Sequence, residues 1–271
     1  MATPLAGIGL ADRESARANL PPLQTGSSLA DYQRFAALNN PGLEARFQEW
    51  RAAVEQVPSV GSLPDPRFTY GYYFGEVETR VGPMQHLFSL SQSLPWPGKL
   101  QHREDAASHR ARAAFARFEA ARLDLFYRVE SAYNRLYFLK RSIDISREMI
   151  DLLAQFERVA QTRYQVGQAG HPDLLKIQVE LGLAEDRLRE LESLRAPYVA
   201  ELNAALSRSA GSEVAWPASV SDREVELSED QIRAAMRERN PQLQALEQDL
   251  ESKRLGVQIA REEGLPDLTV G

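Results

Sequence analysis

One long run of residues constrains the fold of this chain more than any other feature. No proline or glycine occurs from Leu100 to Val166, and these are the two residue types that most often end or weaken a helix. A helix over this run would be roughly 100 Å long at a rise of about 1.5 Å per residue. Because a helical pattern longer than about 25 residues is unusual in a globular domain, the run predicts a coiled coil or an array of long helices.

The segment after this run predicts an antiparallel partner helix. Residues 166–172 are rich in glycine and end in proline, which predicts a turn. After Asp173, apolar residues recur at spacings of 3, 4, 3, 4 and 3, at Leu174, Ile177, Leu181, Ala184, Leu188 and Leu191. This heptad spacing is typical of a coiled-coil seam. We therefore expect an antiparallel helical hairpin over residues 100–206, with its tip at residues 166–173.

Two β-strands are predicted before the long helix. From Arg67 to Phe74, aromatic residues alternate with smaller ones, and residues 85–94 alternate apolar with serine. A polar loop over residues 75–83 is expected between them. The length and alternation match transmembrane barrel strands. A half-buried hairpin of a soluble sheet has the same pattern, so the alternation alone leaves both interpretations open.

Parts of the sequence occur twice, about 200 residues apart. Asn40-Pro41 precedes a helical pattern that ends at Leu63-Pro64-Asp65, and Asn240-Pro241 precedes a similar pattern that ends at Leu265-Pro266-Asp267. Such self-similarity predicts two copies of one structural unit. Since the second copy stops at its first strand, we expect the chain to be a fragment of a longer protein.

These patterns together predict a mostly α chain with a small β part. The expected organisation is a flexible leader (1–28), first-repeat helices (29–62), a β-hairpin (63–99), the helical hairpin (100–206), a connector (207–240) and the start of a second repeat (241–271).

Composition excludes several functions. The net charge of −6 gives no basic footprint for nucleic acid, and the absence of cysteine excludes disulfides and thiolate metal sites. No catalytic motif is recognisable, so we expect neither an enzyme nor a cofactor. His102, His109 and Asp105 share one helical segment, but exposed polar residues near a helix start are a commoner role for them than a metal site. Residues 1–20 lack the pattern of a secretory signal, which we expect to be removed or lost if the protein is exported.

The order of these elements resembles the TolC-like outer-membrane efflux factor family from Leu29 to Gly271. The similarity rests on Asn40-Pro41 and on four motifs, namely Leu63–Pro66, Val77–Pro83, Ser91–Leu100 and Arg163–Gly167 with Asp173-Leu174-Leu175. The Val77–Pro83 loop and the Pro-Trp-Pro-Gly-Lys-Leu turn are most similar to the branch that serves heavy-metal resistance-nodulation-division pumps.

The resemblance implies a homotrimer in the outer membrane with a periplasmic extension. Each protomer would contribute strands to a shared β-barrel and long coiled-coil helices to a periplasmic tunnel. The expected function is passive efflux of small molecules or metal ions, with a periplasmic adaptor protein, an inner-membrane pump and outer-membrane lipid as partners. A soluble coiled-coil scaffold or a periplasmic adaptor is the alternative, since adaptors also contain long helical hairpins.

The resemblance also assigns an adaptor-docking and gating role to the tip of the helical hairpin. The residues are Arg163, Tyr164, Val166, Gly167, Gly170 and Asp173. Gly167 and Gly170 are expected to permit the tight turn. Asp173 has a second possible role, because a carboxylate in the first turn stabilises a helix by about 0.3–1 kcal/mol.

Overall fold

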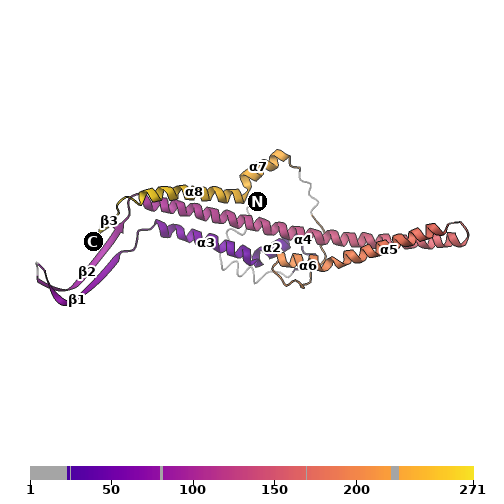
Figure 1. Cartoon of the computed structure of the whole chain (residues 1–271), viewed down its shortest axis with the longest axis horizontal. Coiled ribbons are helices and arrows are strands. Elements are labelled where there is room, and N and C mark those ends of the chain that lie inside the picture. Colours follow the sequence, from indigo (N-terminus) through magenta and orange to yellow (C-terminus); the bar gives the residue numbers. More distant parts are fainter. Residues whose placement is uncertain (1–22, 25, 80–81, 169, 221–225) are drawn as a thin grey trace. The chain divides into compact units, whose positions relative to one another are not determined.

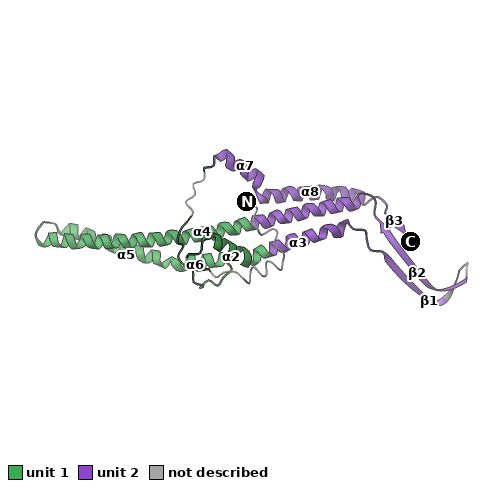
Figure 2. Ribbon diagram, turned by 180° about the vertical axis from the view of Figure 1, so that it is seen from behind, with its two compact units in different colours: residues 1–44, 122–226 green, residues 45–121, 227–271 purple. Residues whose placement is uncertain are grey.

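The computed structural model describes residues 23–24, 26–79, 82–168, 170–220 and 226–271. These residues are mostly helical and include one small antiparallel sheet (Figure 1), which confirms the prediction of a mostly α chain with a small β part. The chain divides into two compact units (Figure 2): residues 1–44 and 122–226 belong to unit 1, and residues 45–121 and 227–271 belong to unit 2. The leader predicted over residues 1–28 lies almost entirely outside the described residues.

Most of the helical hairpin predicted over residues 100–206 lies in unit 1, which includes α4 from residue 122 onward. Helix α4 (Lys99–Gln165) ends near the predicted residue, and α5 (His171–Ser193) runs antiparallel to it (Figure 1). Two side-chain contacts set their register: Glu157 Oε1 accepts a hydrogen bond from Gln178 Nε2 at 2.9 Å, and Arg147 pairs with Glu192 at 2.6 Å. The predicted seam is confirmed, because its six positions are all more covered than the charged residues between them.

The apolar core of unit 1 lies toward the base of this hairpin. Leu139 and Ile143 of α4 pack with Leu191 of α5, and they are joined by Leu188, Leu194, Tyr198 and Trp216. Nearby, the rings of Tyr32 and Tyr133 meet edge to face at 5.4 Å, and burial raises the pKa of both hydroxyls. Tyr32 belongs to α2 (Leu29–Asn39), so these rings fasten the first helix to α4.

The second arm of the hairpin is interrupted where the sequence predicted one helix to residue 206. Helix α5 ends at Ser193, and α6 (Arg195–Ala205) begins after Leu194. Pro197 lies in the first turn of α6 and has no N–H to donate to the carbonyl of Ser193. The helical hydrogen-bond ladder is therefore interrupted at this point.

Unit 2 contains two helices that pack along the N-terminal part of α4 (Figure 1). Aromatic rings join α3 (Pro41–Gly61) to α4, with centroid distances of 5.1 Å for Trp50–Phe115 and 5.8 Å for Phe47–Phe118. Helix α8 (Pro241–Glu262) contacts α4 through smaller residues instead. The buried Ser252 Oγ donates to the Ala106 carbonyl at 3.0 Å.

The three strands of the sheet also lie in unit 2. Strand β1 (Arg67–Thr79) pairs antiparallel with β2 (Gly82–Leu94), which pairs antiparallel with β3 (Leu268–Val270). The predicted loop over residues 75–83 is wrong in extent, because Val77 pairs with Met84 and Thr79 with Gly82. An irregularity between Tyr72 and Val77 absorbs the extra residues of β1, which lets pairing continue past the aromatic stretch.

The structure contains the predicted repeat and extends it. Helices α2 and α7 (Glu229–Arg239) are both 11 residues long, and Ser28 and Ser228 cap them with the same capping box. Asn40 and Asn240 then cap α3 and α8 through their side-chain oxygens. Helix α3 continues through Pro58 to Gly61, close to the end predicted for the first-repeat helices at residue 62, because a proline near a helix end removes only one hydrogen bond.

Candidate functional site

The tip of the helical hairpin is closed by a specific backbone turn. Gly167 has φ +73°, a left-handed conformation that glycine adopts without strain. The N–H of Gly167 donates to the Tyr164 carbonyl at 3.0 Å, and the N–H of Gln168 donates to the Arg163 carbonyl at 2.8 Å. This pair of bonds is a Schellman motif, which satisfies the last carbonyls of α4 and fixes the direction of the chain beyond it.

The start of α5 has a different geometry. Gly170 is its N-cap residue with φ −82° and ψ 150°, a backbone conformation that any residue can adopt, although a Cβ there would lie 3.3 Å from Pro172 Cδ. Of the two glycines expected to permit the turn, only Gly167 therefore has a backbone conformation that favours glycine. Asp173 lies in the first turn of α5, where its charge stabilises the helix N-terminus. The rings of Tyr164 and His171 lie 5.5 Å apart across the tip.

The structure brings the six predicted tip residues together at one end of the hairpin. Four of them end α4 or follow it, and two begin α5: Arg163, Tyr164, Val166, Gly167, Gly170 and Asp173. All six are exposed. The tip is thus a short surface on a fixed turn at the end of two long helices, and a docking role for it stays a prediction.

The Gly167 turn gives a testable expectation. Gly167→Ala should lower the free energy of unfolding by about 1–2 kcal/mol, because a Cβ is disfavoured in the left-handed region. Gly182→Ala in α5 is the matched control, since a Cβ there meets no atom within 4 Å and a helical glycine-to-alanine change is expected to be neutral or stabilising. Thermal unfolding of the helical circular-dichroism signal measures both. Equal shifts would contradict the assigned turn.

A second apolar stripe on the hairpin is exposed. On α4 it follows spacings of 4, 3, 4 and 3, through Ile145, Met149, Leu152, Phe156 and Val159. Exposed apolar residues of α5 near the tip are Leu175, Val179 and Leu183. The absence of proline and glycine predicted one long helix here but did not separate its apolar residues into a covered and an exposed seam. Apolar spacing shows that a helix has seams, and the fold decides which of them is covered.

The β-hairpin presents an exposed aromatic face. Tyr70 pairs with Phe88 across the strands with ring centroids 5.1 Å apart, and Phe68 lies 6.4 Å from Phe88. Their side chains are between 51% and 66% exposed. The Tyr70 hydroxyl and His86 Nδ1 are hydrogen-bonded at 2.9 Å, which ties the two strands together on this face. The predicted alternation therefore places the rings of Phe68, Tyr70 and Phe88 next to one another on one face of the hairpin.

The junction between β2 and α4 contains a polar contact that sequence reasoning missed. The Lys99 N–H donates to the Trp96 carbonyl at 3.1 Å, and Gly98 has φ +96°, so Trp96-Pro97-Gly98-Lys99 forms a type II turn. This turn positions the Lys99 side chain, which is only 3% exposed. Lys99 Nζ donates to Asp267 Oδ1 at 2.8 Å and to the Leu265 carbonyl at 3.0 Å.

We name this contact between Lys99 and Asp267 the junction latch. Asp267 Oδ1 also accepts a hydrogen bond from the Trp96 N–H at 3.1 Å. The hydrogen bond from Lys99, followed by that from Trp96, lowers the pKa of Asp267. The latch thereby fastens the turn after β2 to the residues before β3.

The latch predicts a pH dependence. A carboxylate with a lowered pKa stabilises the folded state above its ordinary pKa of about 3.9, and this contribution is lost as pH falls through the folded-state pKa. We expect Asp267→Asn to unfold at a lower temperature than the unsubstituted chain at neutral pH. The difference should narrow as pH falls below about 4. A difference that stays constant down to pH about 2.5 would show that the Asp267 charge is not responsible.

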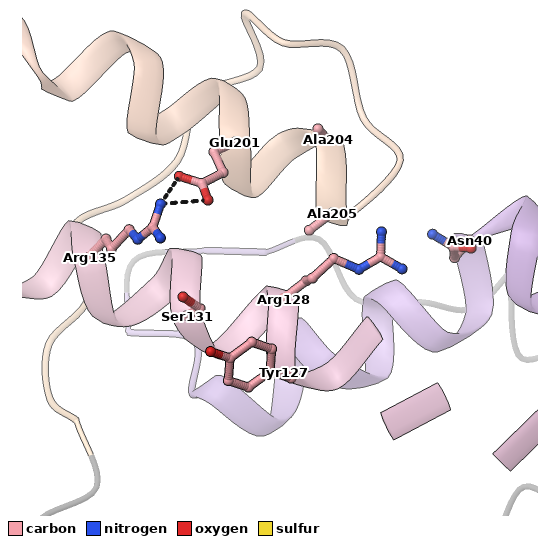
Figure 3. Close-up of a pocket in the computed structure, with 8 residues that line it drawn as sticks. All are labelled: Asn40, Tyr127, Arg128, Ser131, Arg135, Glu201, Ala204 and Ala205. Carbon is pink, nitrogen blue, oxygen red and sulfur yellow. Dashed lines mark hydrogen bonds and ion pairs between the residues drawn. The ribbon is translucent and has the colours of Figure 1, made fainter. Parts of the chain in front are cut away.

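Unit 1 contains a cavity of about 390 Å³ between α4 and α6 (Figure 3). Arg135 and Glu201 face each other across it, with both carboxylate oxygens 2.9 Å from Nη1 of the arginine. Arg128 also lines the cavity and pairs with Asp124 at 2.7 Å. Both arginines of the cavity are therefore paired with carboxylates of the same chain.

The two histidines that suggested a metal site have other partners. His102 Nδ1 lies 2.9 Å from Glu262 Oε1, and His109 Nδ1 lies 2.8 Å from Gln248 Oε1. Both contacts join α4 to α8. Within the part of the chain that the structure describes, no group of three or more metal-binding side chains occurs. The histidines therefore contribute to helix packing.

Comparison of the sequence with known protein families shows which family this chain belongs to. Residues 34–208, more than half of the 271-residue chain, match the outer membrane efflux protein family. The chain belongs to the outer membrane efflux protein family. The family comprises efflux channels and not enzymes. This confirms the resemblance at the level of the family and favours the channel over the scaffold or adaptor alternative. No curated protein sequence matches the chain.

Solved outer-membrane channels share the fold. CusC matches with a TM-score of 0.70 at 14% identity, covering 92% of this chain and 63% of CusC. The outer membrane protein VceC from Vibrio cholerae gives 0.66 at 18% identity, with 89% and 60% covered. The Campylobacter jejuni CmeC outer membrane channel gives 0.64 at 19% identity, with 89% and 54% covered. The chain thus spans 54–63% of the length of these three structures.

None of the described helices is long and apolar enough to cross a membrane.

Proposed function

We propose that this chain is part of a trimeric outer-membrane channel of a tripartite efflux system. The channel is a passive conduit through which small molecules or metal ions leave the periplasm, and an inner-membrane pump supplies the energy. The observation that carries the proposal is the family match over residues 34–208, which includes both the β-hairpin and the helical hairpin. The resemblance of the β2–α4 junction supports the heavy-metal branch of the family as the finer assignment.

The two faces of the β-hairpin support a membrane position. Phe68, Tyr70, Phe88 and Leu90 form its exposed apolar face, whereas Thr69, Gly71, Ser89 and Ser91 alternate with them. Transmembrane barrel strands alternate in this way between lipid and a polar interior. The outer edge of β1 carries no partner strand among the described residues. Because lipid does not tolerate unpaired strand edges, the proposal requires closure by strands of other protomers.

The helical hairpin supports the periplasmic part of the proposal. Its second, exposed stripe (Ile145, Met149, Leu152, Phe156 and Val159) has the spacing of a coiled-coil seam. We assign this stripe to packing against further helices of the channel. The six exposed tip residues are then left at the end of the tunnel, where an adaptor protein docks and the entrance closes.

Oligomeric state in detergent tests the proposal. A chain extended to the full length of a family member is purified in detergent and examined on gels with and without heating, beside the 271-residue chain. We expect a detergent-stable trimer from the extended chain. A stable monomer in water without detergent, for both chains, would contradict the proposed channel.

A further inference from the structure

The junction latch links the end of β2 to the start of β3, the strand with which β2 pairs. Gln92, Ser93 and Leu94 of β2 pair with Val270, Thr269 and Leu268 of β3. Lys99 follows β2 and Asp267 precedes β3, so strand pairing brings the ammonium and the carboxylate together at 2.8 Å. Lys99 is almost fully buried by this arrangement. The acidic residue that precedes β3 therefore forms an ion pair with the basic residue that follows β2, the strand paired with β3.

The repeat places a second acidic residue in the equivalent position. Leu63-Pro64-Asp65 precedes β1 as Leu265-Pro266-Asp267 precedes β3, and each follows the longer helix of its repeat. The helices before them correspond in order and in their caps, as α2 and α3 match α7 and α8. Asp65 is thus the counterpart of Asp267.

Asp65 differs from Asp267 in having no partner within the part of the chain that the structure describes. It is exposed, and among the described residues no hydrogen bond or ion pair reaches its carboxylate. The edge of β1 next to it is also unpaired within the described sheet, whose order is β1-β2-β3. Lys99, the basic residue that follows β2, is already bound to Asp267. A basic partner for Asp65 would therefore have to come from outside the described part of this chain.

We propose that Asp65 is an acceptor for a basic side chain of a second copy of this protein. In this proposal, a strand of the partner's second repeat pairs with the outer edge of β1, and the basic side chain follows that strand. The contact between the two copies then has the same geometry as the junction latch within one chain. The internal repeat is the reason for choosing a second copy as the partner. The first repeat places Lys99 beside Asp267, so the equivalent basic residue of a second repeat would lie beside Asp65. This inference rests on the proposed assembly of several copies and adds a specific residue that holds it together.

Charge substitution at Asp65 tests the inference. Asp65→Asn and Asp65→Lys are made in the chain extended to full family length, and the temperature at which the oligomer separates is read from heated gels. Glu78→Lys is the matched control, because Glu78 is an exposed acidic residue near the opposite end of the same strand. We expect Asp65→Lys to lose the oligomer at temperatures where the unsubstituted protein and Glu78→Lys keep it, with Asp65→Asn in between.

The same substitutions in the 271-residue chain distinguish a contact between copies from a contact within one chain. There, Asp65→Asn should leave thermal unfolding unchanged, whereas Asp267→Asn should lower the unfolding temperature. An oligomer that is indifferent to Asp65→Lys would overturn the inference and leave the proposed function standing. Failure of the unsubstituted extended chain to form any oligomer would instead contradict the proposed function itself.

Discussion

Phe118→Ala is expected to lower the free energy of unfolding by about 3–5 kcal/mol, the range for deleting a large aromatic side chain from a core. Phe118 is 2% exposed, and its ring lies 5.8 Å from Phe47 and 6.3 Å from Phe115. The substitution leaves a cavity where α3 and α4 meet. Chemical denaturation followed by circular dichroism measures the loss.

Phe138→Ala is the control for this experiment. Phe138 is also on α4 but is 61% exposed, so its removal should change the stability of the single chain by no more than about 0.5 kcal/mol. Similar losses for the two phenylalanines would show that the aromatic cluster is not a core. A larger effect of Phe138→Ala in an assembled oligomer than in the single chain would indicate that this ring packs between protomers.

Asn203→Leu is expected to lower the free energy of unfolding by about 1–3 kcal/mol, because it leaves the carbonyls of Ala210 and Ser212 without the donor that they have in the fold. The fully buried Asn203 Nδ2 donates to the Ala210 carbonyl at 3.1 Å and to the Ser212 carbonyl at 2.7 Å. These bonds hold the chain that turns away from α6. Leucine has a similar size, so the loss would arise from missing hydrogen bonds more than from a cavity.

Two further substitutions check this explanation. Asn203→Asp should destabilise at least as much as Asn203→Leu at neutral pH, since a carboxylate would face two carbonyl oxygens in a buried site. Gln155→Leu replaces an exposed amide on α4 and should change stability by no more than about 0.5 kcal/mol. If Asn203→Leu were as mild as Gln155→Leu, the two carbonyls would have other donors.

Much of the fold follows from local sequence patterns. The long helix α4 follows from the absence of proline and glycine between residues 100 and 166, and the seam of α5 follows from a heptad spacing. The strand limits were harder to predict, because the irregularity after Tyr72 has no clear signature in a stretch that looks like a polar loop. Pro197 is a helix-breaking residue in the sequence, but the sequence alone does not show that the helix ends at Ser193 and restarts at Arg195.

The candidate site was predicted only in part. Gly167 and the residues around it were placed at the tip, since a glycine-rich turn between two helices is a local signal. The Lys99–Asp267 latch was missed because its members are far apart in sequence and meet only through the pairing of β2 with β3. The exposed stripe on α4 was missed for a related reason, as apolar spacing shows that a helix has seams but not which seam is covered.

The sequence by itself determined the helices, their caps, the alternating strands and the repeat, because each depends on neighbouring residues or on a fixed period. Only the tertiary structure decided which groups lack partners. Asp65 and Asp267 stand in matching positions of the two repeats, yet Asp267 is bound by a buried lysine, whereas Asp65 has no partner among the described residues. The difference arises because β3 pairs with β2, whereas the outer edge of β1 has no neighbouring strand within the described sheet, and strand pairing acts between segments distant in sequence.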